Sequence, residues 1–117
     1  MGYHSDVTVA MKIADFEDML AKAKNKFGED SEVYEFIKEG KDDAPKCSHK
    51  EYTYLQWLRV KWYEDFDEVA FILEYLKEHK NYHLIEIGED DTDIYEENYT
   101  DEFLLSIKRE VVCEYEE

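Results

Sequence analysis

Residues 3–27 read YHSDVTVAMKIADFEDMLAKAKNKF, and two periodicities in this stretch decide the fold class. Up to residue 12 the side chains alternate with a period of two, which is typical of a strand with one buried face. From Ile13 to Phe27 apolar residues recur every three or four positions, which predicts a helix with one buried stripe. The chain therefore opens with a strand followed directly by a helix that ends at Gly28.

The same two patterns recur further along the chain. They predict a strand over residues 52–62 with apolar residues on both faces, a helix from Asp65 or Asp67 to near Lys80, and strands over residues 82–87 and 103–115. Residues 31–39 fit a helix capped by Ser31 and a strand almost equally well, so that alternative stays open. Arg109 falls on the apolar side of the last strand, where a bulge, a sheet edge or a carboxylate partner would accommodate it.

This order of elements predicts a single α+β domain over residues 1–117. We expect a mostly antiparallel four-stranded sheet with two main helices packed on one face, which leaves the other face free to carry charge. The chain is 44% hydrophobic and 15% aromatic, which is more core-forming material than disordered segments carry. A length of 117 residues suits one domain with one sizeable core.

The charge balance is extreme for so short a chain. Asp and Glu number 31 against 14 Lys and Arg, which gives a formal net charge of −17. Residues 1–27 are neutral, whereas residues 84–117 carry thirteen acids against two bases, Lys108 and Arg109. Repulsion among so many like charges destabilises the folded state. The retention of this excess negative charge therefore indicates a cationic partner. The alternative is acidity that serves only solubility.

The acidic stretch that follows Ile87 is the candidate partner-binding surface. Closely spaced carboxylates on a surface imitate a row of phosphates and fit the basic channel of a protein that binds DNA or RNA. Tyrosines among them would supply desolvated anchors, although sheet tyrosines give the same pattern. The candidate residues are Glu89, Asp90, Asp91, Asp93, Tyr95, Glu96, Glu97, Tyr99, Asp101 and Glu102.

Other kinds of chemistry find little support in the sequence. Four scattered glycines cannot form a phosphate-binding loop, and direct nucleic-acid binding needs the basic patches that this chain lacks. No Ser, His and Asp set is recognisable, and with so many acids some pair of carboxylates is inevitable by chance. The sequence therefore predicts neither an enzyme nor a cofactor.

Metal-site patterns are present but incomplete. Cys47 and His49 are spaced to share a zinc ion, yet no second pair completes a four-ligand site. Five residues stand at positions 1, 3, 5, 7 and 12 of a calcium-loop template, but Glu96 occupies the position that requires glycine. We expect no specific metal site, only loose association of divalent ions with Asp91, Asp93, Tyr95, Glu97 and Glu102.

The sequence also bears on the compartment. It holds no stretch of 18 apolar residues and no export signal at its start, so we expect a cytoplasmic protein without a membrane partner. Cys47 and Cys113 are then expected to be reduced thiols, with a single bridge between them as the alternative.

Three short stretches resemble small acidic proteins encoded by phages and prophages: MGYHSDV at residues 1–7, WLRVKWYEDF at 57–66 and IGED at 87–90. The resemblance implies a phage accessory protein in an infected bacterium, a setting in which small acidic proteins include inhibitors of restriction and CRISPR enzymes. We therefore expect a non-enzymatic inhibitor of a host nucleic-acid-handling defence enzyme, foremost a CRISPR effector. The alternative is a structural or small-ligand-binding phage protein.

Overall fold

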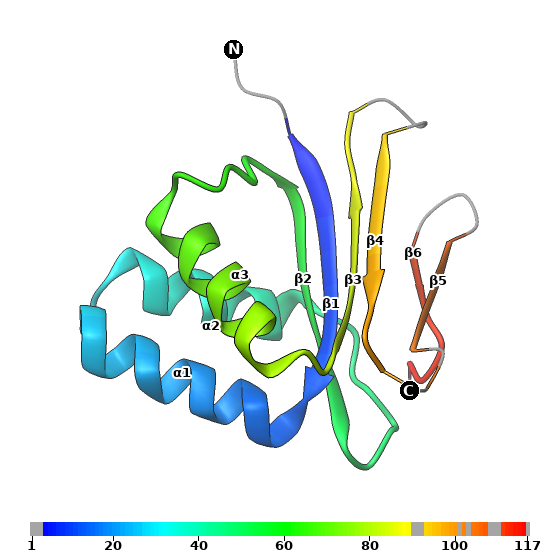
Figure 1. Cartoon of the computed structure of the whole chain (residues 1–117), viewed down its shortest axis with the longest axis horizontal. Coiled ribbons are helices and arrows are strands. Elements are labelled where there is room, and N and C mark those ends of the chain that lie inside the picture. The colour runs from blue at the N-terminus through cyan, green and yellow to red at the C-terminus, as the bar shows by residue number, and fades with distance from the viewer. Residues whose placement is uncertain (1–3, 90–92, 101, 103, 108–110, 117) are drawn as a thin grey trace.

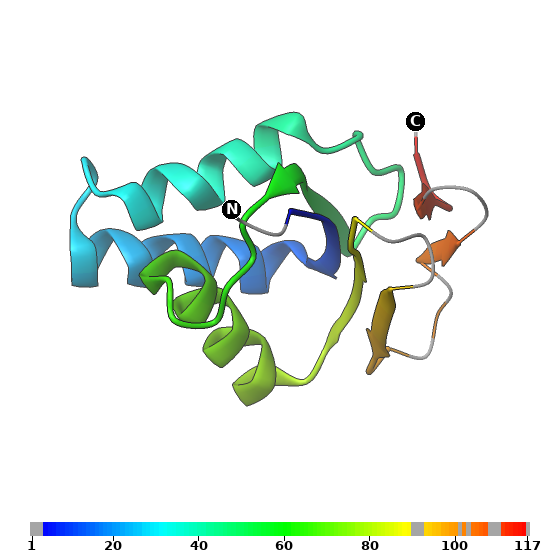
Figure 2. The same cartoon turned by 90° about the horizontal axis from the view of Figure 1, so that it is seen from above.

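The computed structural model describes residues 4–89, 93–100, 102, 104–107 and 111–116. Four strands form one antiparallel sheet in the order β2-β1-β3-β4, where β1 is Ser5–Lys12, β2 is Tyr52–Val60, β3 is Tyr82–Ile87 and β4 is Ile94–Asn98. Helices α1 (Ile13–Phe27), α2 (Glu32–Asp43) and α3 (Asp67–His79) cover one face of the sheet, as Figures 1 and 2 show. A small hairpin of β5 (Leu105–Ile107) and β6 (Val111–Cys113) lies against the other face (Figure 2). The predicted α+β class and antiparallel sheet are confirmed.

The opening strand and helix occupy the ranges that their periodicities predict. Val7, Val9 and Met11 on β1 are buried beneath the helices, together with Phe16 and Met19 of α1. Gly28 ends α1 with a φ of 99°, a left-handed region that favours glycine, and its N–H donates to the carbonyl of Lys24. The last turn of α1 carries lysines, which its negative dipole end favours.

Residues 31–39, which the sequence left open, belong to helix α2. The Ser31 hydroxyl accepts a hydrogen bond from the Tyr34 N–H at 3.2 Å and caps the helix, as the helical alternative required. The helix extends beyond the range that the sequence indicated, because α2 continues to Asp43. Gly40 is there for packing: a Cβ at this position would overlap the Trp57 indole ring, with Nε1 only 2.6 Å away. Among the described residues the molecule therefore has three helices, where two main helices were predicted.

Helix α3 begins and ends close to the expected residues, but its N-cap residue is not one of those expected. Its N-cap is Phe66, which makes no side-chain capping bond, so the predicted cap at Asp65 or Asp67 is wrong. Asp67 and Glu68 lie in the first turn instead, where carboxylates favourably face the positive end of the helix dipole.

The sheet has a hydrophobic cluster on each face. The larger one joins the helices to one face of the sheet and includes Trp57, whose ring stacks on Phe36 at 5.0 Å and whose N–H donates to the Phe36 carbonyl. The smaller one joins Tyr54 and Ile85 of the sheet to Leu105 and Cys113 of the hairpin. The prediction that β2 is covered on both sides is confirmed. The prediction that the face opposite the helices is free to carry charge is wrong, because the β5–β6 hairpin packs on it.

The strand predicted over residues 82–87 is confirmed as β3, whereas the predictions for the rest of the chain are corrected. The fourth strand of the sheet is β4, which lies in the stretch that we expected to be an acidic connection. Residues 103–115 do not form one strand, because the chain there makes the β5–β6 hairpin. Arg109, which the predicted last strand would carry on its apolar side, lies outside the described residues.

Both cysteines are free thiols, as the sequence predicted. Burial, reinforced by the negative charge of Glu116, raises the pKa of the Cys113 thiol to about 12, so this thiol stays protonated at neutral pH. Within the described ranges, no helix has the length and apolar character needed to cross a membrane.

Candidate functional site

The acidic candidate residues fall on and around the β3–β4 hairpin. Residues that face each other in this antiparallel pair share a side of the sheet, and Glu86 faces Tyr95 while Leu84 faces Glu97. Tyr95 and Glu97 therefore lie on the helix side. Glu96 faces Ile85 and lies on the side of the β5–β6 hairpin. The strand thus displays its carboxylates on both sides of one sheet edge, not on a single face.

Three of the candidate carboxylates bond to histidines that are distant in sequence. Glu89 Oε1 lies 3.2 Å from His4 Nδ1 and also accepts from the His4 backbone N–H at 2.8 Å. Glu96 Oε2 lies 2.6 Å from Nε2 of the buried His83, and Glu102 Oε1 lies 3.0 Å from His49 Nε2. The His4 hydrogen bonds hold the pKa of Glu89 below its usual value. None of these three pairs was predicted from the sequence.

The fourth carboxylate, Glu97, is held by tyrosines. It accepts a hydrogen bond from the Tyr82 hydroxyl at 3.0 Å and a longer one from the Tyr99 hydroxyl at 3.4 Å. Tyr95 and Tyr99 are 51% and 49% exposed, so both rings are available as contact surface. The remaining candidates are Asp93, which is exposed before β4, and Asp90, Asp91 and Asp101, which lie outside the described residues.

Lysine pairs with carboxylate elsewhere in the molecule. In the described part of the chain such ion pairs join Lys22 to Asp18 at 3.2 Å and Lys24 to Glu29 at 3.8 Å, both in or just after α1. Glu89, Glu96, Glu97 and Glu102 have no lysine or arginine at ion-pair distance among the described residues; their partners are histidines and tyrosines. The tyrosine partners of Glu97 are uncharged donors, so they leave the negative charge of this carboxylate in place.

Glu86 on β3 adds a carboxylate that sequence analysis did not single out. It lines a hollow of about 270 Å³ on the helix side, together with Glu64, Tyr95, Glu97 and Lys77. Burial raises the pKa of Glu86 to about 7, the neighbouring Trp62 N–H opposes the shift, and the charges of Glu97, Glu64 and Asp93 reinforce it. Carboxylates here are therefore close enough to repel one another.

Glu86→Gln should stabilise the protein at pH 8 but not at pH 4.5. The pKa of Glu86 rises from 4.5 to about 7 on folding, so the folded state holds the extra proton between these values and stability falls as pH rises through them. Allowing for solvent screening, we expect a gain of about 1–2 kcal/mol in unfolding free energy at pH 8. Urea unfolding at the two pH values measures it. Glu89→Gln is the control, because the pKa of Glu89 is lowered and its neutralisation should give no such gain. An equal effect of Glu86→Gln at both pH values would contradict the raised pKa.

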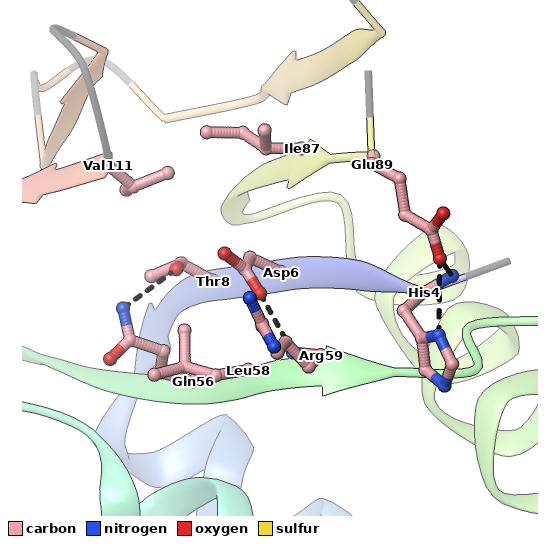
Figure 3. Close-up of a pocket in the computed structure, with 10 residues that line it drawn as sticks. His4, Asp6, Thr8, Gln56, Leu58, Arg59, Ile87, Glu89 and Val111 are labelled. Carbon is pink, nitrogen blue, oxygen red and sulfur yellow. Dashed lines mark hydrogen bonds and ion pairs between the residues drawn. The ribbon is translucent and has the colours of Figure 1, made fainter. Parts of the chain in front are cut away.

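On the opposite side of the sheet, a hollow of about 760 Å³ lies beside Glu89 (Figure 3). Its polar residues bond to one another: Gln56 Nε2 donates to Thr8 Oγ1 at 3.2 Å, and the Arg59 backbone N–H donates to Asp6 at 2.8 Å. Arg59 has a φ of 53° where the β1–β2 register shifts, which marks a strained bulge. The volume lies in the range of small-ligand sites.

The calcium-loop template is not realised around its described members. Tyr95 and Glu97 lie in the extended strand β4, not in a tight loop. No cluster of three or more His, Cys, Asp or Glu side chains suited to a metal ion occurs in the part of the chain that the structure describes.

Comparison with protein-family models, with curated proteins and with solved structures finds no match to this chain. The fold and the candidate site alone define its class: an α+β domain whose fourth strand bears carboxylates and the exposed Tyr95, with the exposed Tyr99 just after it.

Proposed function

We propose that this protein is a non-enzymatic, phage-type inhibitor that binds a basic nucleic-acid-handling host enzyme, foremost a CRISPR effector, and occupies the channel meant for nucleic acid. The binding surface is the acidic β3–β4 region, with Glu89, Glu96, Glu97 and Glu102 as phosphate surrogates and Tyr95 and Tyr99 as anchors. Asp90, Asp91, Asp93 and Asp101 belong to the same proposed surface by their place in the sequence. The partner is a protein, not a nucleic acid or a membrane.

The observation that carries this proposal is the choice of partners around these carboxylates. Glu96 bonds to a histidine and Glu97 to two tyrosines, so neither is neutralised by a lysine or arginine within the described residues. Charge left unpaired at a surface attracts a basic groove over a distance and speeds association. Solubility alone would not require this negative charge to be gathered on one strand.

The placement of the carboxylates suits a basic groove that reaches both sides of the sheet edge. Glu96 projects on the hairpin side of β4 and the adjacent Glu97 on the helix side, so a cationic partner meets a carboxylate on each side of the strand. The exposed rings of Tyr95 and Tyr99 flank them and supply apolar contact area beside the charges.

An affinity pull-down from host lysate at low and high salt tests the proposed function. We expect recovery of a nucleic-acid-binding enzyme that high salt or added DNA displaces, and that the purified protein inhibits. Recovery of no such enzyme, or of one whose binding ignores both salt and DNA, would overturn the proposal.

The 760 Å³ hollow favours a second candidate, a small-ligand-binding accessory protein. That function places binding at the bulge beside Arg59 and makes it independent of the β4 carboxylates. The pull-down separates the two, because a small-ligand protein has no salt-sensitive affinity for basic enzymes.

A further inference from the structure

Strand β4 is an edge of the sheet whose backbone has a definable orientation. The Gly88 N–H donates to the Asp93 carbonyl at 2.8 Å and the Tyr99 N–H donates to the Tyr82 carbonyl at 2.9 Å. In an antiparallel pair, hydrogen-bonded and non-hydrogen-bonded residues alternate. With the observed register, Tyr95 and Glu97 therefore direct their backbone groups toward β3. Ile94, Glu96 and Asn98 direct theirs outward.

This outward row has no strand beside it among the described residues, since β4 ends the sheet order β2-β1-β3-β4. The β5–β6 hairpin forms its own two-stranded sheet and packs on the face of the main sheet, not along the edge (Figure 2). Ile94 and Tyr95 are 42% and 51% exposed. An open edge of this kind is a template for an added strand.

The side chains of β4 select the chemistry of that added strand. Glu97 and Tyr95 project on the helix side, and Glu96 and Ile94 project on the hairpin side, so each side offers one carboxylate and one apolar surface. A neighbouring strand with lysine or arginine across from the glutamates would form favourable cross-strand pairs on both sides. Its remaining side chains would cover Tyr95 and Ile94.

A second copy of this chain fits the edge poorly. Pairing β4 with itself would bring the Glu96 and Glu97 of one copy close to those of the other, and like charges across a strand pair are destabilising. Each copy also carries a net charge of −17. Charged side chains on an edge are a recognised means of preventing such self-association.

We propose that the β4 edge binds an extended, lysine- or arginine-rich segment of the partner protein as a fifth strand of the sheet. The inference rests on the proposed function, from which it takes the basic character of the partner. It adds that outward N–H and C=O groups of Ile94, Glu96 and Asn98 hydrogen-bond to the segment, so recognition depends on backbone geometry as well as charge.

The test uses two synthetic heptapeptides of the sequence Lys-Lys-Val-Val-Lys-Lys-Val, which places lysine and valine on both sides of an extended strand. One is unmodified and the other is N-methylated at every amide. Both carry the same charge, but only the first can pair with a strand. We expect the unmodified peptide to bind at least tenfold more tightly. On its binding, hydrogen exchange should slow at the Ile94, Glu96 and Asn98 amides, while those of Tyr95 and Glu97 are already protected in the free protein.

A variant of the edge itself supplies the second arm. Ile94→Pro removes one outward N–H without breaking the bonds to β3, and Ile94→Ala is the matched control for the lost side chain. We expect Ile94→Pro to weaken binding of the unmodified peptide about tenfold relative to Ile94→Ala. Circular dichroism and thermal unfolding establish that both variants are folded.

The outcomes separate this inference from the proposed function. Equal binding of the two peptides would overturn strand addition and leave attraction between charges, and with it the proposed inhibitor, standing. Binding of neither peptide would also overturn strand addition, while the lysate pull-down judges the inhibitor independently. Concentration-dependent dimers that protect the same three amides would replace the basic segment with a second copy.

Discussion

The double substitution Glu96→Lys with Glu97→Lys is expected to weaken binding of the recovered enzyme about a hundredfold. Each change replaces attraction to a basic groove with repulsion, and a charge pair at a partly exposed interface is worth roughly 1–2 kcal/mol. Two reversals together then amount to about 3 kcal/mol, or two factors of ten in the dissociation constant. Titration calorimetry or surface plasmon resonance at fixed low salt measures the loss.

The matched control separates local from total charge. Glu39→Lys with Asp42→Lys changes the net charge by the same amount, but both residues are exposed near the end of α2, which packs on β2 at the opposite edge of the sheet. Lysines there also suit the negative end of the helix dipole. We expect this control to lose less than threefold in affinity. Equal losses in the two double variants would mean that net charge, not the β4 surface, drives association.

Elements with a strong local pattern could be read from the sequence. Helix α1 buries a single face, and its period of three to four indicates its type and ends. Strand β1 has the predicted period of two, but the prediction that only one of its faces is buried is wrong, because Thr8 and Ala10 are buried as well. The start of α2 could be predicted from Ser31, but its end could not. Glycine stands at position 40 inside the helix because the Trp57 ring, far along the chain, leaves no room for a Cβ there. Contact between distant segments leaves no mark on a local window.

Strand β4 escaped prediction because an edge strand needs no alternation of apolar and polar side chains. Most of its residues are exposed on both sides, and its backbone bonds to β3 hold it in place. The β5–β6 hairpin was not predicted because its residues are buried in a pattern that does not alternate. Leu104 and Leu105 are adjacent and both buried, a pattern that a single two-sided strand with one dry face does not give.

The candidate site was located by composition and not by geometry. Counting charges drew attention to residues 89–102, and the described carboxylates of that range do lie around one sheet edge. Their partners could not be foreseen, since His4 and Glu89 are 85 residues apart in sequence and His49 and Glu102 are 53 apart. The raised pKa of Glu86 likewise depends on burial that only the fold creates.

Tyr54→Phe is expected to lower the free energy of unfolding by about 2 kcal/mol, the second large effect. The Tyr54 side chain is fully buried, and its hydroxyl donates to the Leu104 carbonyl at 2.8 Å and accepts from the Tyr115 N–H at 3.0 Å. Burial raises the pKa of this phenol, so the hydroxyl stays protonated and can do both. These two bonds tie the C-terminal segment to the sheet.

Removing the hydroxyl leaves the two backbone groups in unequal positions. The Leu104 carbonyl retains its bond from the Glu114 N–H at 3.0 Å, whereas the Tyr115 N–H loses the acceptor that Tyr54 supplied. An unsatisfied buried donor costs about 1–3 kcal/mol. The Tyr115 N–H is partly buried, so we take a value in the middle of this range, about 2 kcal/mol, for its loss together with the bond to Leu104. The ring remains, so packing of the smaller hydrophobic cluster is preserved and the change isolates the polar term.

Thermal and urea unfolding of Tyr54→Phe, with Tyr34→Phe as the control, measure the effect. Tyr34 is partly exposed on α2, so the loss of its hydroxyl should change the free energy of unfolding by less than about 0.5 kcal/mol. Hydrogen exchange should accelerate more at the Tyr115 amide than in β1, because the C-terminal segment loosens before the sheet opens. Affinity for the basic partner should stay unchanged at temperatures where the variant is folded, since the β4 edge pairs with β3 and does not depend on this contact. A variant that lost affinity while keeping its fold would place the β5–β6 hairpin within the binding surface.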